Sequence, residues 1–396
     1  MVGDVINRQG PLRFDEFLEL ALYGPDGFYA RGRGAGRRGD FLTSPEVGPL
    51  FGAVVARALD VEWRGQGQPD PFVVVEAGAG RGQLARSLLD ANPACAGSLR
   101  YVCVERSPTL RAAATAVLHP EPATMLLGPV VGADEELRVL PGRGPLVAVV
   151  EELPATVGVH AVLANELLDN LPFRLLQRHE HGWGEVFVGM NADGALGELL
   201  VDAAPGVAAE ADRLAPDAPS GARIPLQHAA VTWLRRALAL VVRGRVVVID
   251  YADTTAGLAL RPWHHWTRTY RAHGRGGAPL DTPGSQDVTC EVAVDQLAAA
   301  VGRPDADRSQ AEWLASHGID ELVAAARSTW HERAHLGDLA ALAARSRVGE
   351  AEALCDPGGL GAFRVLEWLL PRGGGGAAGI SAGVGHQDRS GAEGDR

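Results

Sequence analysis

Apolar and polar residues follow one another along this chain in a pattern that predicts alternating strands and helices. Runs of β-branched and other apolar residues, as expected of strands buried on both faces, lie at 72–76, 101–105, 146–150, 159–164 and 246–250. Amphipathic segments next to these runs predict helices at 82–90, 107–117 and 226–242. Because strand and helix alternate repeatedly, we expect an α/β fold with a parallel sheet and helices on both of its faces.

Segments outside this alternation predict additions to the sheet. Two helices precede the first strand, at 11–23 and 46–63, and Ser44 is the expected N-cap of the second. The later part of the chain predicts a hairpin at 173–178 and 184–189, helices at 292–301, 309–317 and 319–345, and a last strand near 362–369. We therefore expect a helical, lid-like N-terminal region at 1–66, a core at 67–370 with an insertion at about 252–345, and a disordered tail at 371–396.

The composition excludes several classes of protein. Of 396 residues, 46% are hydrophobic, which is enough for a large core. The formal net charge of −12 disfavours nucleic-acid binding, because phosphates attract positive charge. The four cysteines are widely spaced, so we expect neither a metal site nor a disulfide framework. No apolar stretch has the length of a signal peptide or membrane span, and we expect a cytoplasmic protein without a membrane partner.

The clearest chemical signal is a glycine-rich loop between a predicted strand and a predicted helix. Glu76 ends the strand, and Gly78, Gly80 and Gly82 follow at intervals of two residues. Glycine adopts positive φ values and lets a ligand approach the backbone closely, and the start of the next helix offers free N–H groups. The loop therefore predicts a site for a carboxylate or phosphate group, although a tight strand-to-helix turn would use the same residues.

Two further residues narrow the class of ligand. A dinucleotide fingerprint would place its third glycine at position 83, where this chain has Gln83. Glu76 suits the cationic end of an aminoacyl ligand better than a pyrophosphate. The next strand ends in Glu105, where a carboxylate can accept hydrogen bonds from both ribose hydroxyls. The loop and the acid together favour a ligand that contains a nucleoside, although an acid at a strand end is often merely exposed to solvent.

Four sequence blocks stand out, which together span about residues 23–320. The blocks are 23–29 with 39–46, then 76–82, then 164–172, and finally 249–251 with 287–289 and 310–319. These blocks resemble the MidA-like family of class I methyltransferases. The resemblance implies a Rossmann-like class I methyltransferase core with an N-terminal helical addition and an inserted substrate-side region. It also implies S-adenosyl-L-methionine as cofactor, and protein arginine methylation, the activity of the family's best-understood member.

The block after the strand at 159–164 supplies candidates for catalysis under this resemblance. An arginine guanidinium is protonated at neutral pH, so carboxylates must hold it and partly deprotonate it. Glu166 and Asp169 lie at the carboxyl end of a sheet strand, where ligands bind in open α/β sheets, and we expect them to face the substrate. Capping of a helix N-terminus would explain Asn165 and Asp169 equally well.

The remaining candidates are divided between cofactor and substrate. The expected cofactor-binding residues are Glu76, Gly78, Gly80, Gly82, Glu105, Thr43, Ser44 and Asn165. The expected substrate-binding residues are Asp40, Tyr251, His273 and Asp287. The residues outside the glycine loop could also have a purely structural role. Ser44 could cap the helix at 46–63, and Tyr251 could simply end a buried strand.

The leading prediction is a methyltransferase that acts on arginine in a partner protein. Three alternatives stay open. One is an assembly factor or interaction protein that keeps the fold with little turnover, and another is a small-molecule methyltransferase, because the fold does not fix the acceptor. The third is an NAD-dependent oxidoreductase, which Gln83 disfavours.

Overall fold

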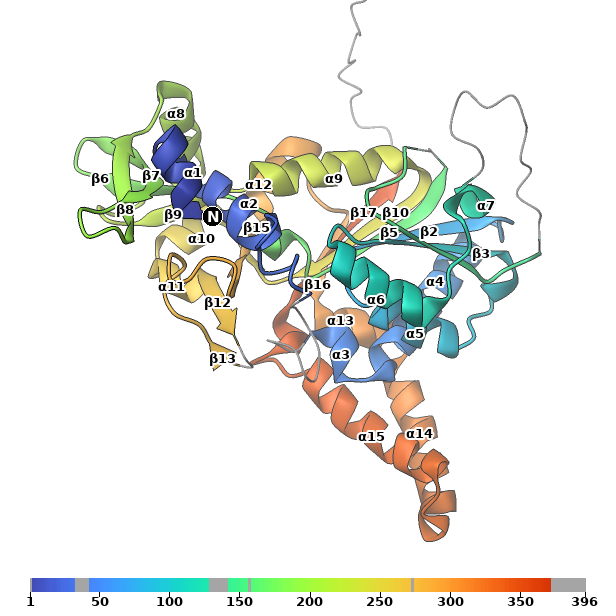
Figure 1. Ribbon diagram of the computed structural model, residues 1–396. Helices are drawn as coiled ribbons and strands as arrows, with labels where there is room; N and C mark the ends of the chain where they lie inside the picture. The colour runs from blue at the N-terminus through green and yellow to red at the C-terminus, as the bar shows by residue number, and fades with distance from the viewer. Residues whose placement is uncertain (1, 33–42, 128–141, 156–157, 272–273, 372–396) are drawn as a thin grey trace, which may run out of the picture.

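The computed structural model describes residues 2–32, 43–127, 142–155, 158–271 and 274–371. Its centre is a seven-stranded sheet (Figure 1). From one edge to the other, the strands are β4 (Leu146–Val150), β3 (Leu99–Val104), β2 (Phe72–Ala77), β5 (Val159–Asn165), β10 (Val241–Asp250), β17 (Arg364–Leu370) and β16 (Ala306–Ser309). All five predicted buried runs are strands of this sheet.

The order of these strands identifies the topology. β4, β3, β2, β5 and β10 are parallel, whereas β17 runs antiparallel between β10 and β16. This is the Rossmann order 3-2-1-4-5-6 with one antiparallel strand inserted before the last. The expectation of a parallel sheet is therefore wrong at β17. Because the strand order reverses between β2 and β5, a ligand-binding crevice is expected at the carboxyl ends of these two strands.

Helices cover both faces of the central sheet. One face carries α4 (Pro49–Gly65), α5 (Gln83–Asp90) and α13 (Gln310–Ser316), and the other carries α9 (His228–Leu240) and α12 (Val294–Val301). Two further helices, α6 (Pro108–Leu118) and α7 (Ala123–Leu127), follow β3 in the chain. The predicted helices at 82–90, 107–117 and 226–242 are confirmed as α5, α6 and α9.

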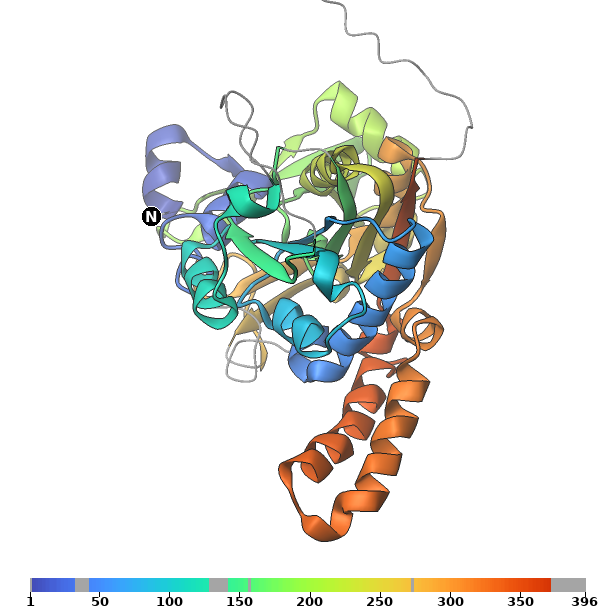
Figure 2. The same ribbon diagram turned by 90° about the vertical axis from the view of Figure 1, so that its right-hand side faces the viewer.

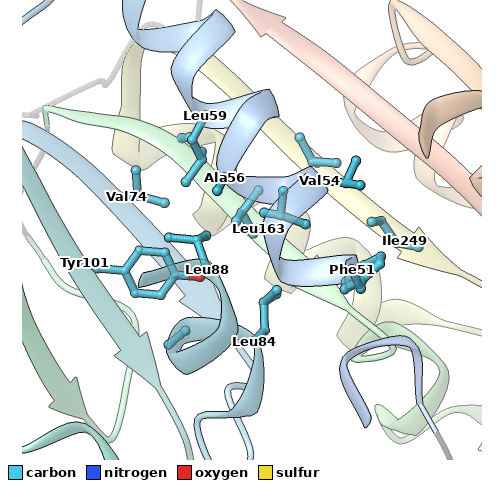
Figure 3. Packing of buried hydrophobic residues seen from close by; sticks show 14 of the residues in the cluster. Phe51, Val54, Ala56, Leu59, Val74, Leu84, Leu88, Tyr101, Leu163 and Ile249 are labelled. Carbon is cyan, nitrogen blue, oxygen red and sulfur yellow. The ribbon is translucent and has the colours of Figure 1, made fainter. Parts of the chain in front are cut away.

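Both faces of the sheet are apolar, which explains why its strands appear in the sequence as continuous hydrophobic runs. In β2, Val74 packs toward α4 and α5, whereas Val73 packs toward α9 and α12. Figure 3 shows the first of these cores, where Phe51 of α4 and Leu84 of α5 lie close to Leu163 of β5. Burial of each such large aliphatic or aromatic side chain contributes roughly 1.5–3 kcal/mol.

A second sheet lies beside the first, at the left of Figure 1, and carries the N-terminal helices. Its five strands are β1 (Leu12–Arg13), β6 (Arg174–His179), β7 (Gly182–Met190), β8 (Leu196–Asp202) and β9 (Arg223–Leu226). The helices packed with it are α1 (Val2–Gln9), α2 (Phe14–Tyr23) and α8 (Pro205–Leu214). The predicted hairpin is confirmed as β6 and β7, whereas the helix predicted at 11–23 begins only at Phe14 because β1 precedes it.

The chain after β10 folds into short elements. These are β11 (Ala252–Asp253), α10 (Thr255–Ala259), α11 (Trp263–Trp266), β12 (Thr267–Arg271), β13 (Gly274–Arg275), β14 (Asp287–Cys290) and β15 (Val292–Ala293). β12, β13 and β14 form a three-stranded sheet, and β11 pairs with β15. Trp266 is fully buried in the same hydrophobic cluster as Phe14 and Phe28, so these elements share a core with the N-terminal helices.

Two helices, α14 (Ile319–Arg333) and α15 (Leu339–Leu354), form a hairpin that projects from the body of the molecule (Figures 1 and 2). The sequence predicts a single helix at 319–345, and this prediction is wrong. The chain reverses at Gly337, which has a φ of 60°. Asp338 then caps α15 by accepting the N–H of Ala341 at 2.9 Å.

The helix predicted at 46–63 is also interrupted. α3 (Ser44–Val47) ends before Gly48, and α4 begins at Pro49. A proline disfavours helical conformation in the residue before it, and Gly48 is extended, with a φ of 167°. Ser44 lies in the first turn of α3 rather than at its N-cap, a position that Thr43 occupies.

The predicted domain limits at residues 66 and 370 stay predictions. Within the first segment, α1 and α2 pack with the second sheet, whereas α4 packs on the central sheet. The predicted tail lies outside the described residues except for Pro371. Among the helices that the structure describes, none combines the length and the hydropathy needed to cross a bilayer.

Candidate functional site

A cavity of about 590 Å³ opens at the carboxyl ends of the central strands. Its walls include the glycine loop after β2, Glu105 after β3, Glu151 after β4 and Asn165 at the end of β5. This is the crevice expected where the strand order reverses. Small-molecule sites have volumes of roughly 300–1,000 Å³, so the cavity has the size of a cofactor site.

The three glycines of the loop have different neighbours. Gly78, Gly80 and Gly82 all adopt left-handed conformations, with φ values of 73°, 55° and 79°. A Cβ on Gly78 would approach Leu167 to 3.0 Å, and one on Gly82 would approach Leu118 to 2.8 Å. A Cβ on Gly80 would meet nothing within 4 Å, and Gly80 lines the cavity. The outer glycines therefore let the loop pack closely, whereas the middle one leaves room for a ligand.

Glu105 holds this loop in place from the neighbouring strand. Its Oε2 accepts the N–H of Gly80 at 2.8 Å, and its Oε1 accepts the N–H of Ser107 at 2.7 Å. Burial raises the pKa of Glu105, while these two bonds and the charge of Arg111 lower it. Each carboxylate oxygen can accept a second hydrogen bond. The predicted contact with ribose hydroxyls is therefore compatible with the contacts inside the protein.

Glu76 is the last residue but one of β2 and lines the cavity. Its Oε2 accepts the hydroxyl of Tyr101 at 2.8 Å. Burial raises the pKa of Glu76 to about 8, although the bond from Tyr101 lowers it. A cationic group in the cavity would favour the charged carboxylate. The position thus suits the amino or sulfonium group of a ligand.

Glu166 combines a strained backbone with a half-buried carboxylate. Its φ is 51°, which is uncommon for a residue other than glycine, and its N–H donates to the carbonyl of Ile249 at 2.8 Å. Its Oε1 accepts the N–H of Ser44 at 3.0 Å and the side-chain amide of Asn165 at 3.1 Å. Burial raises the pKa of Glu166 to about 7, although these bonds lower it. Strain held in place at a cavity wall marks a candidate for function.

The residues around Glu166 include a polar atom without a partner. Oδ1 of Asn165 is buried and accepts no hydrogen bond from any described residue, although Asn165 lines the cavity. Leaving such an atom unpaired costs roughly 1–3 kcal/mol, which a ligand donor would recover. The hydroxyl of Ser44 donates to Gln310 at 3.0 Å, and Thr43 lines the cavity beside it.

Asp169 and Asp250 form a buried acidic pair next to this wall, with exposures of 3% and 1%. Asp250 accepts the N–H groups of Leu168 at 3.0 Å, Asp169 at 3.2 Å and Tyr251 at 3.0 Å. Burial raises the pKa of both acids well above its usual range, and nearby carboxylates raise it further. Asp169 is not among the described residues that line the cavity, so its predicted contact with substrate stays a prediction.

A hydrogen-bonded network joins the N-terminal region to the chain after β10. The hydroxyl of Tyr29 donates to Asp287 at 3.0 Å, and the side-chain amide of Asn170 donates to both oxygens of Asp287 at 3.3 Å. The hydroxyl of Tyr23 donates to the carbonyl of Asn170 at 3.1 Å. The rings of Tyr23 and Tyr29 stack with centroids 5.3 Å apart, and both line the cavity, whereas Asp287 is fully buried.

The other predicted substrate residues have separate positions. The ring of Tyr251 packs against Phe363 with centroids 4.0 Å apart, and a side-chain hydrogen bond from Tyr251 lowers the pKa of Glu166. Burial raises the pKa of Tyr251 itself. Asp40 and His273 lie outside the described residues. The roles predicted for these three residues stay predictions.

Sequence reasoning missed several residues of the cavity wall. Arg106 lies 4.4 Å from the ring centroid of Tyr23, and Trp233 and Arg236 extend from α9. In the sequence, these are ordinary positions of a loop and an amphipathic helix, so no signal marks them. Glu151 and Glu152, in contrast, follow a predicted strand. The rule that identified Glu105 as an acid at a strand end applies to them equally.

The sheet order, the glycine loop and the acids at the strand ends define a Rossmann-like protein of the class I methyltransferase type. Residues 54–309 match the model of a family described as "Putative S-adenosyl-L-methionine-dependent methyltransferase". The chain therefore belongs to this family of S-adenosylmethionine-dependent methyltransferases. The predicted fold class and the predicted family resemblance are both confirmed.

A crystal structure from Burkholderia thailandensis that contains S-adenosyl-homocysteine is similar over most of its length. The two chains share 26% identity and a TM-score of 0.72, over 92% of this chain and 89% of that one. The mitochondrial protein arginine methyltransferase NDUFAF7 homolog of Drosophila melanogaster is 29% identical over 296 residues, covering 72% of this chain and 65% of the relative. The NDUFAF7 protein of Rattus norvegicus is 31% identical over 194 residues, covering 46% of this chain and 43% of the relative.

Two conclusions follow from these relatives. The chain spans less than two thirds of the length of the fly and rat proteins that it matches. The predicted cytoplasmic location is contradicted, because the named relatives are mitochondrial proteins.

Proposed function

We propose that this chain binds S-adenosylmethionine in the cavity at the carboxyl ends of β2, β3 and β5, and transfers its methyl group to arginine in a partner protein. The family to which the chain belongs supports the cofactor, as does the S-adenosyl-homocysteine in the Burkholderia structure. The names of the NDUFAF7 relatives as protein arginine methyltransferases support the acceptor.

The cavity offers a matching group for each part of this cofactor. Gly80 leaves open space beside the loop, and Glu105 accepts hydrogen bonds at the position expected for ribose hydroxyls. Glu76 lies where a carboxylate would face the cationic amino and sulfonium groups. The unpaired Oδ1 of Asn165 can accept a hydrogen bond from the amino group. Thr43 adds a hydroxyl to the same wall.

The charge of the cavity favours a cationic acceptor. Among the described lining residues, acids outnumber bases, with Glu46, Glu76, Glu105, Glu151, Glu152 and Glu166 against Arg81, Arg106 and Arg236. A guanidinium keeps its charge at neutral pH, so an acidic cavity binds it through charge-assisted hydrogen bonds. Asp169 and Asp250 add buried acidic groups next to this wall, and the network of Tyr29 and Asp287 braces it.

Methyl transfer to arginine requires positioning and the removal of one proton. The cofactor supplies a methyl group on a sulfonium, so that a C–N bond forms to the guanidinium while the C–S bond breaks and sulfur takes its electron pair. Glu166 orients the guanidinium and accepts the proton that its nitrogen loses. Ser44 and Asn165 fix the Glu166 carboxylate for this step, and its pKa of about 7 suits proton transfer at neutral pH.

The observation that carries this proposal is the carboxylate of Glu166, which lines the cavity on a backbone with a φ of 51°. The test incubates the protein with isotopically labelled S-adenosylmethionine and arginine-containing peptides, with lysine-containing peptides as the comparison, and detects labelled methylarginine by mass spectrometry. Glu166→Gln should slow transfer by about 100-fold or more. Binding of S-adenosyl-homocysteine should persist in this variant. Glu180→Gln, which alters an exposed acid in the turn between β6 and β7, should retain the wild-type rate. Equal rates for Glu166→Gln and wild type, or label on lysine alone, would contradict the proposal.

A further inference from the structure

The cavity at the carboxyl ends of the strands reaches both faces of the central sheet, where α5 and α9 lie on opposite sides (Figure 1). Ala79 and Leu84 line it and belong to the core under α4 and α5. On the other face, three apolar side chains line it and pack against the core under α9 and α12, and an arginine of α9 follows one turn after the last of them. We call these four residues the α9 wall: Leu153, Leu171, Trp233 and Arg236.

The α9 wall is apolar apart from Arg236. Leu153 follows β4 and Leu171 follows β5, and both are only partly buried, as is Trp233. An accessible indole ring in a concave wall binds apolar side chains well, and tryptophan often carries much of the energy of such contacts. None of the residues expected to bind the cofactor belongs to this wall. The wall therefore suits an apolar side chain of a polypeptide.

Arg236 differs from the other bases that line the cavity. Arg81 donates to the carbonyl of Gly32 at 2.7 Å, and Arg106 forms an ion pair with Glu19. Arg236 is exposed and makes no hydrogen bond or ion pair with any residue that the structure describes. Its guanidinium is therefore available to an anionic group that enters the cavity.

The acids nearest to the α9 wall in the sequence have other partners. Glu151 forms an ion pair with Arg111 at 3.1 Å. The hydrogen bond from Arg106 to Glu19 raises the pKa of Arg106, and the charge of Glu152 adds to this effect. The helix α9 itself contains no acid. The positive charge of Arg236 is thus not neutralised by its own helix or by an ion pair with these acids.

We propose that the α9 wall binds the part of the partner protein next to the target arginine, and selects a segment that contains an acidic residue. An apolar side chain of this segment packs on Trp233, and its carboxylate forms charge-assisted hydrogen bonds with Arg236. Because the acids of the same cavity repel negative charge, a carboxylate suits Arg236 better than a doubly charged phosphate group. This inference rests on the proposed function for the target arginine, but segment binding does not require methyl transfer to occur.

The test measures the affinity of fluorescent arginine-containing peptides for the full chain saturated with S-adenosyl-homocysteine. Glutamate is moved through the positions on both sides of the arginine, and each peptide is compared with its glutamine counterpart. At the best position, wild type should bind the glutamate peptide about tenfold more tightly. Arg236→Gln should abolish this preference. Arg235→Gln, which alters an exposed arginine of α9 outside the cavity lining, should keep it. Trp233→Ala should weaken binding of both peptides by about tenfold.

Three results would overturn the proposal. The first is a wild type without any preference for glutamate, and the second is an unchanged preference in Arg236→Gln. The third is a loss of affinity for S-adenosyl-homocysteine in folded Arg236→Gln or Trp233→Ala, which would assign the wall to the cofactor.

The rate of methyl transfer separates this proposal from the proposed function. Where transfer occurs, the glutamate preference should appear in KM and not in kcat. Methylarginine formed with the same KM from both peptides would contradict the role of the wall and leave the proposed function standing. A glutamate preference in binding, without any transfer, would support the wall and contradict the proposed function.

Discussion

Glu105 and Asp250 occupy corresponding positions at two places in the central sheet. Each follows or ends a parallel strand, and each accepts N–H groups from the loop after the neighbouring strand. Glu105, next to β3, binds Gly80 in the loop after β2. Asp250, in β10, binds Leu168 and Asp169 in the loop after β5. The same arrangement of carboxylate and backbone thus anchors both loops at this edge of the sheet.

The two carboxylates differ in what surrounds them. Glu105 lines the cavity, and the positive charge of Arg111 lowers its pKa against the effect of burial. Asp250 is fully buried beside Asp169, and the charge of Glu166 raises its pKa further. Burial thus raises the pKa at both sites, and the neighbouring charge opposes this effect at Glu105 and adds to it at Asp250. The comparison teaches that the same arrangement of carboxylate and backbone can stand beside an open cavity or inside an acidic cluster, with neighbouring charges that act on the carboxylate in opposite directions.

The largest expected effect is on stability, at Asp250. Asp250→Leu removes the acceptor of three backbone N–H groups and should destabilise the fold by about 5 kcal/mol. Asp250→Asn keeps one acceptor oxygen but turns its amide toward at least one of these N–H groups, so it should cost less than the leucine variant, about 2 kcal/mol. Equilibrium unfolding in denaturant measures both values. Equal losses in the two variants would show that the oxygen kept in Asp250→Asn does not stabilise this loop.

The next effect is a pH dependence that arises from Glu76. Burial raises its pKa from 4.5 to about 8, so the native state retains a proton that the unfolded chain has lost across this interval. Stability therefore falls as pH rises from about 4.5 to 8, and the loss is complete above the folded pKa. Glu76→Gln removes the dependence, and its stability relative to wild type should increase by on the order of 4 kcal/mol across that interval. Unfolding in denaturant at several pH values measures this difference. If the free energies of unfolding of the two proteins change with pH in parallel, Glu76 is not the source of the dependence.

A smaller effect is expected on ligand affinity, which should depend on Glu105 but not on Asp250. Glu105→Gln replaces one acceptor oxygen with an amide that faces a backbone donor, either Gly80 or Ser107. Its affinity for S-adenosyl-homocysteine should fall by about 2 kcal/mol, or roughly thirtyfold. Asp250→Asn should bind this ligand like wild type. Calorimetric titration of both variants checks the contrast, which fails if Asp250→Asn loses as much affinity as Glu105→Gln.

The smallest effect concerns the brace that joins the N-terminal region to the acidic side of the site. Tyr29→Phe removes the hydrogen bond to Asp287 but keeps the stacking on Tyr23. The variant should lose about 1 kcal/mol of stability. A shift of the denaturant midpoint without a change in slope would show this. A loss of several kcal/mol would mean that Tyr29 does more than donate this bond.

One group of candidate site residues is local in the sequence, and the roles predicted for it stay predictions. Glu76, the three glycines and Glu105 belong to one strand–loop–helix–strand unit, whose patterns of apolar residues and glycine are visible in the sequence. The acidic side depends on distant contacts instead. Asp250 reaches Leu168 across 82 positions, and Tyr29 reaches Asp287 across 258. The chain pattern contains no information about such pairs until the order of strands is known.

The fold shows the same division. The buried strands were predictable because β-branched runs mark them, and β17 is the strand predicted near 362–369. Apolar residues do not reveal the direction of a strand, so only the antiparallel direction of β17 was missed. The helix breaks at Gly48 and Gly337 do have signals, because the chain has Gly-Pro at the first and Gly-Asp at the second. Hydrophobic periodicity continued across both positions and outweighed these signals in the sequence prediction.

The measurement that tests cofactor binding most directly is calorimetric titration with S-adenosyl-homocysteine. Gly80→Val places a side chain in the cavity, whereas Gly194→Val places one at a similar positive φ of 82° in the turn between β7 and β8, where a Cβ would meet nothing within 4 Å. Wild type and Gly194→Val should bind S-adenosyl-homocysteine at one site, and neither should bind NAD. Gly80→Val should not bind S-adenosyl-homocysteine. No binding by folded wild-type protein, or equal binding by Gly80→Val, would contradict the assignment of this cavity to S-adenosylmethionine.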